Sequence, residues 1–309
     1  MDKGKLKGHA ALWVANIIWG LNSPICKSVL QSDTNPEGIN PFALSAYRMI
    51  GACLLFWTAS IFFPKERVAP KDIFHLFLAS LFGIQVNQML FLWGLSLTSP
   101  IDASIIATVV PILTMVMAMF FLGEPITWLK SGGVAMGAAG AIMLVLLSQT
   151  ASSGGVSDLR GNIICISSAV SYSIYLTAFR DAIVKYSPVT TMKWMFLFAA
   201  IGAVIIYREQ MAAVDYAAIA TRTWAGAAYV IIGATFLSYL TVPIGQRYLR
   251  PTLVSTYNYV QPIIAVLFSV AIGIDTFSVG KGLAALCVFL GVGMVTKSKS
   301  KTDLQLEKK

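Results

Sequence analysis

Polar side chains with helical spacing interrupt a long apolar run near the start of the chain. Asn16, Trp19 and Asn22 follow one another at intervals of three residues, so an α-helix would place them on one face. A polar group surrounded by hydrocarbon needs a hydrogen-bonding partner, a water-filled cavity or a bound solute. Amide groups donate and accept hydrogen bonds and an indole N–H donates one, but neither group is a nucleophile, so this face indicates recognition of a polar solute. The alternative, equally open, is a set of hydrogen bonds that join helices.

Similar side chains occur inside later apolar runs. Ser255, Asn258 and Gln261 form a second polar stripe, and Gln85 and Gln88 share a face of another run. Tyrosines and tryptophans within the runs add rings that could stack on an aromatic or cationic ligand, with core packing as the alternative. The candidate substrate-cavity residues, which combine an apolar setting with a polar or aromatic side chain, are Asn16, Trp19, Asn22, Arg48, Gln85, Gln88, Trp93, Ser104, Thr108, Ser168, Tyr172, Tyr175, Tyr239, Ser255, Asn258 and Gln261.

Arg48 is the clearest charge inside an apolar run, about seven residues from the start of that run. A guanidinium remains charged in proteins, so in hydrocarbon it must face a cavity, bind a carbonyl or extend to the interface. Two interpretations therefore stay open for Arg48, a substrate-binding or gating role and a structural one.

Few residues are suited to catalysis or metal binding. The chain has two histidines, His9 and His75, and neither an HExxH nor a GxSxG motif. The four cysteines have no metal-ligand spacing, so we expect no metal, no cofactor and no disulfide. The acidic residues Asp102, Glu124 and Asp275 stand near run ends, where the last two would cap helix starts. A membrane-embedded enzyme is therefore a distant alternative.

The elements that must position these residues follow from the composition. Of the 309 residues, 57% are hydrophobic and 12% are charged, and the mean hydropathy is +0.73. A soluble domain carries roughly 25% charged residues, so most of this surface must face lipid. A helix of about 20 residues crosses the bilayer core, and the backbone of such a run is satisfied in lipid as a helix. Ten runs qualify: His9–Leu30, Pro41–Phe63, Ile73–Leu97, Asp102–Leu122, Thr127–Ser148, Leu159–Ile183, Pro188–Tyr207, Trp224–Arg247, Thr252–Gly273 and Val279–Thr296.

The lysines and arginines between the runs predict the orientation. With the N-terminus inside, the inner segments hold 16 of them and the outer segments hold 4. Positive charge collects on the cytoplasmic side of membrane proteins, so we expect both termini in the cytoplasm. This distribution also explains the net charge of +9 without a nucleic-acid partner. The four outer residues are Arg160, Arg208, Arg222 and Lys281.

The two halves of the chain align on each other. A shift of 153 residues places Trp19, Asn22 and Lys27 on Tyr172, Tyr175 and Arg180. A shift of 151 residues places Gly94, Pro100, Ser104, Pro111, Glu124, Lys130 and Gly140 on Gly245, Pro251, Ser255, Pro262, Asp275, Lys281 and Gly291. Because five helices per half is an odd number, the second half would enter from the opposite side, as an inverted repeat.

Several of these residues together resemble the EamA-type branch of the drug/metabolite transporter superfamily. They are Trp19-Gly20-Leu21-Asn22-Ser23-Pro24, Arg48, Ala103-Ser104, Pro111, Leu122-Gly123-Glu124-Pro125 and the glycine-rich stretch from Gly132 to Gly140. The resemblance covers nearly the whole chain. It implies ten helices, alternating access and export of small polar or amphipathic metabolites, but it names no substrate.

We therefore expect an all-α integral membrane protein of ten transmembrane helices in two inverted five-helix repeats. Residues 1–148 and 159–296 would form the repeats, joined by a linker at 149–158 and followed by a charged cytoplasmic tail at 297–309. The expected partners are the lipid bilayer of the cytoplasmic membrane and a small molecule such as an amino acid, a nucleoside or a related amphipathic solute.

Three alternatives stay open beside this expectation. Carboxylates are absent from the middle of the runs, so facilitated diffusion or exchange is as well supported as proton antiport. A lipid-handling or flippase-like protein of the same fold is the second interpretation of the function. The glycine-rich stretch that begins at Gly132 and Gly133 would allow either close packing of helices or a homodimer.

Overall fold

The computed structural model describes residues 3–31, 35, 37–98, 103, 106–147, 159–271 and 278–299. The regular elements in these ranges are helices, joined by one isolated bridge between Leu30 and Ile39. They are α1 (Lys3–Val29), α2 (Pro41–Ala59), η1 (Ser60–Phe62), α3 (Pro70–Ser80), η2 (Leu81–Val86), α4 (Asn87–Leu97), α6 (Val110–Leu122), α7 (Trp128–Leu147), α8 (Leu159–Ala178), α9 (Arg180–Lys185), α10 (Pro188–Ile206), α11 (Arg208–Ala212), α12 (Thr221–Ile231), η3 (Ile232–Leu237), α13 (Ser238–Tyr248), α14 (Pro251–Thr256), η4 (Tyr257–Tyr259), α15 (Val260–Ala271) and α16 (Val279–Lys297).

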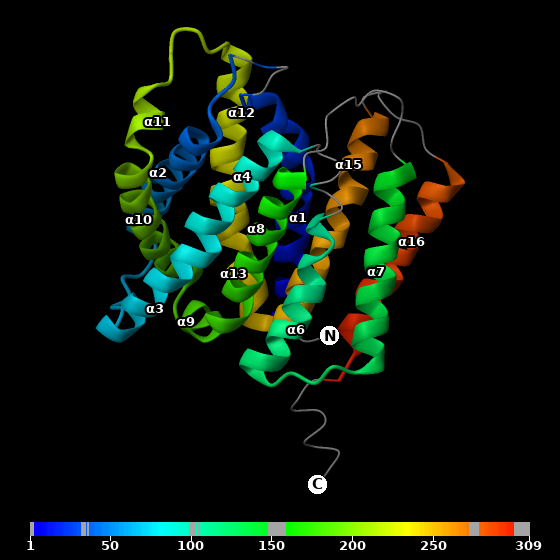
Figure 1. The fold of residues 1–309 in the computed structure, drawn as a ribbon. Helices are drawn as coiled ribbons and strands as arrows, with labels where there is room; N and C mark the ends of the chain where they lie inside the picture. Colours follow the sequence, from blue (N-terminus) through cyan, green and yellow to red (C-terminus); the bar gives the residue numbers. More distant parts are fainter. Residues whose placement is uncertain are drawn as a thin grey trace.

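The helices form one bundle in which α1 and α8 stand near the middle (Figure 1). α1 contacts α12, α13 and α15, while α8 contacts α4 and α6. The start of α1 and the end of α16 lie at the same end of the bundle (Figure 1). Near that end His9 Nδ1 is 2.6 Å from the Tyr257 hydroxyl, which joins α1 to η4.

Within the described ranges, six helical stretches are long and apolar enough to cross a membrane, and α6 is a shorter apolar helix. The six are Pro41–Phe62, Pro70–Leu97, Leu159–Ala178, Pro188–Ile206, Thr221–Tyr248 and Val279–Lys297. The described parts of the other predicted runs are helical as well, in α1, α7 and α15. The all-helical membrane architecture agrees with the sequence, and the count of ten spans stays a prediction.

Proline and polar caps mark where these helices begin. Pro41, Pro70, Pro188 and Pro251 each stand in the first turn of a helix, where a missing amide hydrogen costs nothing. α6 ends at Gly123, whose φ of 61° is open to glycine at little cost. Glycine there lets the Glu124 amide bond back to the Ala118 carbonyl, which closes the helix end.

Two predicted helices are interrupted. The sequence predicts one helix over Asp102–Leu122, but a turn at residues 108–109 precedes the start of α6 at Val110, and Asp102 and Ser104 lie outside the described residues. The sequence also predicts one helix over Thr252–Gly273, but η4 separates α14 from α15. Pro111 and Pro262 supply the reason, because a proline ring removes one backbone hydrogen bond and crowds the carbonyl four residues earlier.

The structure also differs from the prediction at a third run and at one helix cap. The run Leu159–Ile183 is divided, because α8 ends at Ala178 and α9 begins at Arg180. The sequence predicts Glu124 as a cap for the start of α7, but its carboxylate instead accepts a hydrogen bond from Lys130 Nζ at 2.8 Å. The Thr127 hydroxyl accepts the Lys130 amide and takes the capping place. Asp275 lies outside the described residues.

Each half of the chain contains a π-helical segment, and the two segments lie 151 residues apart. π-Helical segments occur at Leu81–Val86 in η2 and at Ile232–Leu237 in η3. The flanking helices α3 and α12, and α4 and α13, also begin and end 151 residues apart. A π-helical turn is rare and is often found at functional sites, so its recurrence at one shift is a structural correspondence between the halves.

Two glycines at corresponding positions of the two halves each pack closely against a neighbouring helix. Gly94 of α4 faces Cys165 of α8, and Gly245 of α13 faces Leu12 of α1. The glycines are 151 residues apart and their partners are 153 apart, the shifts found in the sequence alignment. A side chain at either glycine would meet the facing helix, so these contacts hold α4 to α8 and α13 to α1 at short range.

α7 and α16 lie against each other at one side of the bundle (Figure 1). A Cβ added at Gly140 would lie 2.7 Å from the Ala284 carbonyl oxygen, and one at Gly291 would lie 2.6 Å from the Gly133 carbonyl oxygen. Gly137 faces the Tyr259 ring. Part of the glycine-rich face that the sequence offers to a homodimer is therefore occupied within the chain.

Gly140→Ala is expected to lower the apparent unfolding temperature of the detergent-purified protein by several degrees, because overpacking a tight contact typically costs about 1–3 kcal/mol. Gly293→Ala on α16 is the matched control, since a Cβ there would meet nothing within 4 Å. The control should be neutral or slightly stabilising. Equal losses in the two variants would contradict the packing described for α7 and α16.

Candidate functional site

Three aromatic side chains meet where α1, α8 and α13 come together. The Trp19 ring lies 6.2 Å from Tyr172 and 6.1 Å from Tyr239 between centroids, edge-on in both cases. Tyr172 also stacks on Tyr175 at 5.7 Å. Both tyrosines that contact Trp19 are buried. The sequence-predicted residues Trp19, Tyr172, Tyr175 and Tyr239 are thus brought together in one aromatic group.

The two π-helical segments anchor this group. Trp19 Nε1 donates to the Ala234 carbonyl of η3 at 2.8 Å, and the Tyr239 hydroxyl donates to the Gly83 carbonyl of η2 at 2.9 Å. Gly83 and Ala234 are themselves 151 residues apart. Buried carbonyls need partners, so each π segment fixes the orientation of one ring.

Arg48 lies beside this group on α2. Its side chain is buried, with 4% of the residue exposed, and Nε donates to the Thr235 hydroxyl of η3 at 2.9 Å. Thr235 in turn donates to the Val230 carbonyl at 2.7 Å. Arg48 therefore does not reach the interface, and it binds a hydroxyl where the sequence suggests a carbonyl.

Gln88 of α4 is buried and has no close hydrogen bond. It is 2% exposed, and neither its amide nitrogen nor its amide oxygen has a partner at the distance and angle of a regular hydrogen bond. The amide does lie close enough to the Tyr239 hydroxyl of α13 to interact with it, and the charge of Arg48 also acts on that tyrosine. Because buried amides are normally satisfied, Gln88 has spare hydrogen-bonding capacity next to the aromatic group.

A second polar group joins α1 to the α15 region. Gln261 Nε2 donates to Asn16 Oδ1 at 2.9 Å and to Asn258 Oδ1 at 3.3 Å, while Asn16 Nδ2 donates to the Leu12 carbonyl at 2.8 Å. Ser255 donates to the Thr252 carbonyl of its own helix. These amides are paired with one another, so this group connects helices.

The remaining predicted site residues are dispersed. Ser168 clamps α8 to α4, because it donates to the Asn87 carbonyl and accepts from the Asn87 amide. Asn22 accepts a hydrogen bond from the Cys26 thiol, and Gln85 packs against Gly202 of α10. Trp93 is 36% exposed and contacts Phe42 at the edge of the bundle. Thr108 is buried, and Ser104 lies outside the described residues.

Two basic residues each bind carbonyls at the end of a neighbouring helix. Lys27 Nζ donates to the carbonyls of Leu95, Ser96 and Thr98 at 2.9, 3.3 and 3.1 Å, at the end of α4. Arg180 donates to the Gln246 carbonyl near the end of α13 at 3.3 Å. These cations satisfy carbonyls that a helix end leaves open. The alignment of the halves pairs Lys27 with Arg180, but the sequence alone gives them no role.

Polar contacts also join loops at the end of the bundle where α10 begins. Ser187 donates from its amide and its hydroxyl to Glu66 at 2.9 and 2.8 Å, and Lys185 Nζ lies 2.6 Å from Asp72. Partial burial raises the pKa of Glu66, but the hydroxyls of Thr190 and Ser187 outweigh it, so the pKa lies below its usual value. Glu66 therefore stays ionised at neutral pH.

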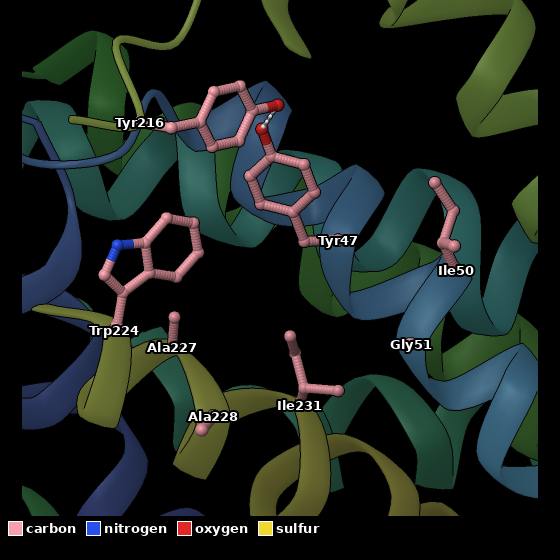
Figure 2. Close-up of a pocket in the computed structure, with 8 residues that line it drawn as sticks. All are labelled: Tyr47, Ile50, Gly51, Tyr216, Trp224, Ala227, Ala228 and Ile231. Carbon is pink, nitrogen blue, oxygen red and sulfur yellow. Dashed lines mark hydrogen bonds between the residues drawn. The ribbon is translucent and has the colours of Figure 1, made fainter. Parts of the chain in front are cut away.

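A pocket of about 400 Å³ lies between α2 and α12, under Tyr216 (Figure 2). The Tyr47 and Tyr216 hydroxyls are 2.8 Å apart and point toward each other, and the Tyr216 ring stacks on Trp224. Because its two hydroxyls satisfy each other, the pocket offers an apolar surface. Its lining is Tyr47, Ile50, Gly51, Tyr216, Trp224, Ala227, Ala228 and Ile231.

A model of one protein family, described as the EamA-like transporter family, matches residues 6–146 and again residues 159–297. The chain belongs to this EamA-like transporter family. It is therefore a multi-pass membrane protein of the drug/metabolite transporter superfamily that carries a small molecule, and not an enzyme.

The relatives of this chain include proteins named as uncharacterized transporters and a WAT1-related protein. The uncharacterized transporter YyaM of Bacillus subtilis (strain 168) is 22% identical over 81% of this chain and 80% of its own length. The uncharacterized transporter YcxC of the same strain is 24% identical over 92% and 91%. WAT1-related protein At5g13670 of Arabidopsis thaliana is 21% identical over 92% and 82%.

A solved crystal structure shares the fold. It matches with a TM-score of 0.72 and 19% identity, and the match covers 95% of this chain and 98% of that one.

Gln88→Leu is expected to leave the unfolding temperature in detergent unchanged or to raise it, because it removes a buried amide that forms no close hydrogen bond. Gln261→Leu, the control, should lower it by an amount that corresponds to about 1–3 kcal/mol, since it leaves Asn16 and Asn258 without their partner. Similar losses in both variants would mean that Gln88 has a structural partner in solution.

Proposed function

We propose that this transporter is a carrier of ten membrane-spanning helices in two inverted five-helix halves. It would export small polar or amphipathic metabolites across the cytoplasmic membrane by alternating access. The observation that carries the proposal is the group of half-buried Trp19 with buried Arg48, Gln88, Tyr172 and Tyr239, which has unused hydrogen-bonding capacity and contains residues of both halves.

Correspondence between the halves supports the inverted repeat. The family model matches once in each half. The π-helical segments and the glycine contacts recur at shifts of 151 and 153 residues. Two related halves that enter from opposite sides can build an inward and an outward gate from one pattern. The boundaries that we propose for them are 1–148 and 159–296.

Lys27 and Arg180 fit the gates of such a carrier. Each holds the end of one helix, Lys27 on α4 and Arg180 on α13. The charge distribution would place Arg180 on the cytoplasmic side and Lys27 on the outer side. Separation of α1 from α4 would then open the outer gate, and separation of α8 from α13 would open the inner gate.

The test is transport by the purified protein in liposomes, with substrates drawn from a metabolite-by-metabolite screen of cells that overproduce it. A carrier shows saturable flux and accelerated exchange when substrate is present on both sides. Flux that does not saturate with substrate concentration would indicate a channel and would contradict the proposal.

Arg48→Ala is expected to abolish this transport, at least 100-fold below wild type, while expression and elution from a sizing column stay normal. A shift of 147 residues, which places Pro41 of α2 on Pro188 of α10, aligns Arg48 with Met195, so the scaffold does not require a cation at this place. Lys193→Ala is the control, because Lys193 lies over the Trp57 ring at 5.2 Å, where the charge can stay at the interface. Wild-type flux in Arg48→Ala would remove Arg48 from the site.

Lys27→Met and Arg180→Met are expected to shift the conformational equilibrium in opposite directions. In a cysteine-free background, Thr98→Cys and Leu249→Cys report the two helix ends, since both positions are buried in the structure. An impermeant maleimide added outside should label Thr98→Cys several-fold faster in the Lys27→Met variant. In inside-out vesicles, the same reagent should label Leu249→Cys several-fold faster in the Arg180→Met variant. Unchanged rates in both would contradict the gating role.

The pocket between α2 and α12 favours a second candidate, lipid handling. Its apolar lining suits an acyl chain better than a polar solute (Figure 2). Scrambling of a fluorescent phospholipid by the same liposomes, abolished by Ala228→Phe in the pocket and insensitive to Arg48→Ala, would support this candidate against metabolite transport.

A further inference from the structure

The charge of Arg48 is not balanced within the part of the chain that the structure describes. Its hydrogen bond goes to a neutral hydroxyl on Thr235, and the ion pairs of the described residues involve other side chains. A guanidinium does not give up its proton in proteins. Burying an unpaired ion is strongly unfavourable even after the protein relaxes. The environment of Arg48 therefore favours the binding of an anion.

The depth of Arg48 argues against a lipid headgroup as that anion. Arg48 stands two residues from the middle of α2, about 3 Å along a helix that rises 1.5 Å per residue. Lipid phosphates lie at the surface of a hydrocarbon core roughly 30 Å thick, about 15 Å from its centre. A solute that enters between the halves can reach Arg48, whereas a membrane phosphate would have to leave its layer.

The surroundings of Arg48 define the rest of the ligand. Gln88 offers an amide donor and acceptor that lies against Tyr239 and forms no close hydrogen bond. The rings of Trp19, Tyr172 and Tyr239 offer an apolar wall. Among the described residues of this group there is no aspartate or glutamate, so an ammonium group on the solute would find no counter-ion.

We infer that the solute is a monocarboxylate with an apolar or aromatic body and without an ammonium group. This inference rests on the proposed function and names the substrate class of that site. The carboxylate would pair with the free nitrogens of Arg48, and one cation matches one negative charge. The Gln88 amide would complete the hydrogen bonds, and the rings would cover the body of the solute.

The test is equilibrium binding to the full chain in detergent, with four probes that share one body. They are 3-phenylpropanoate, its neutral amide 3-phenylpropanamide, the zwitterion L-phenylalanine and the cation 3-phenylpropylamine. The acid should bind at least tenfold more tightly than each of the others. Octanoate and octanamide form a second pair, and the acid should again be preferred. Equal binding within both pairs, preference for the amine, or no saturation by either acid at millimolar concentration overturns the inference.

Variants assign the preference to this site. Arg48→Gln should remove the difference between acid and amide, and Arg48→Lys should restore part of it. Gln88→Glu places a carboxylate in the same group, so it should fold at least as stably as wild type and lose acid binding. Lys193→Gln is the control and should keep the preference. Survival of the preference in Arg48→Gln and Gln88→Glu would overturn the assignment.

Two further measurements distinguish a bound solute from a lipid headgroup, and binding from transport. In nanodiscs of phosphatidylcholine with and without phosphatidylglycerol, stabilisation that depends on Arg48 and follows the anionic lipid instead of the acid would identify a headgroup and defeat the inference. Binding needs no gradient, so acid binding without saturable flux would leave the inference standing and defeat the proposed carrier. Saturable flux of neutral or cationic solutes without acid binding would support the proposed carrier and defeat the inference about its substrate.

Discussion

Two backbone carbonyls, those of Gly83 and Ala234, set the arrangement on which the centre of this protein depends. Both belong to π-helical segments, and inside an apolar bundle a carbonyl must be satisfied by the protein itself. The partners are the Tyr239 hydroxyl and the Trp19 indole. Each bond crosses from one half of the chain to the other, so the same interaction joins the halves and fixes the rings at their boundary.

The scaffold keeps the correspondence between the halves, whereas the site breaks it. Glycine contacts and helix-end cations recur at matching positions. Around the central rings the aligned residues differ: Arg48 aligns with Met195, and Gln88 aligns with Tyr239. A strictly symmetric centre would present the same groups twice. The differences give the centre one cation and one amide without a close hydrogen bond, and so, in the proposed carrier, a direction in which a solute would be held.

Much of this could be predicted from the sequence, since long apolar runs and their few charges restrict a membrane chain to helices. The aromatic group is predictable as well, because Trp19 and Tyr172 are rings with a polar group deep in aligned runs. Spacing cannot tell paired amides from unpaired ones. Asn16 and Gln88 look alike in a helical pattern, yet Asn16 is hydrogen-bonded to Gln261 whereas Gln88 forms no close hydrogen bond. That distinction depends on which helix lies opposite, which single-helix periodicity does not contain.

The close approach of α7 and α16 limits how such a chain can change over generations. Gly133 packs on Gly291, and Gly140 packs on Ala284, so each helix is the template for the other. A larger residue on one helix requires a smaller residue on the facing helix. Substitutions in the two halves are therefore coupled at this contact. Either half alone would leave this face bare to lipid or to a second copy. A single chain that carries both helices therefore keeps, in one polypeptide, a contact that separate halves would have to form by assembly.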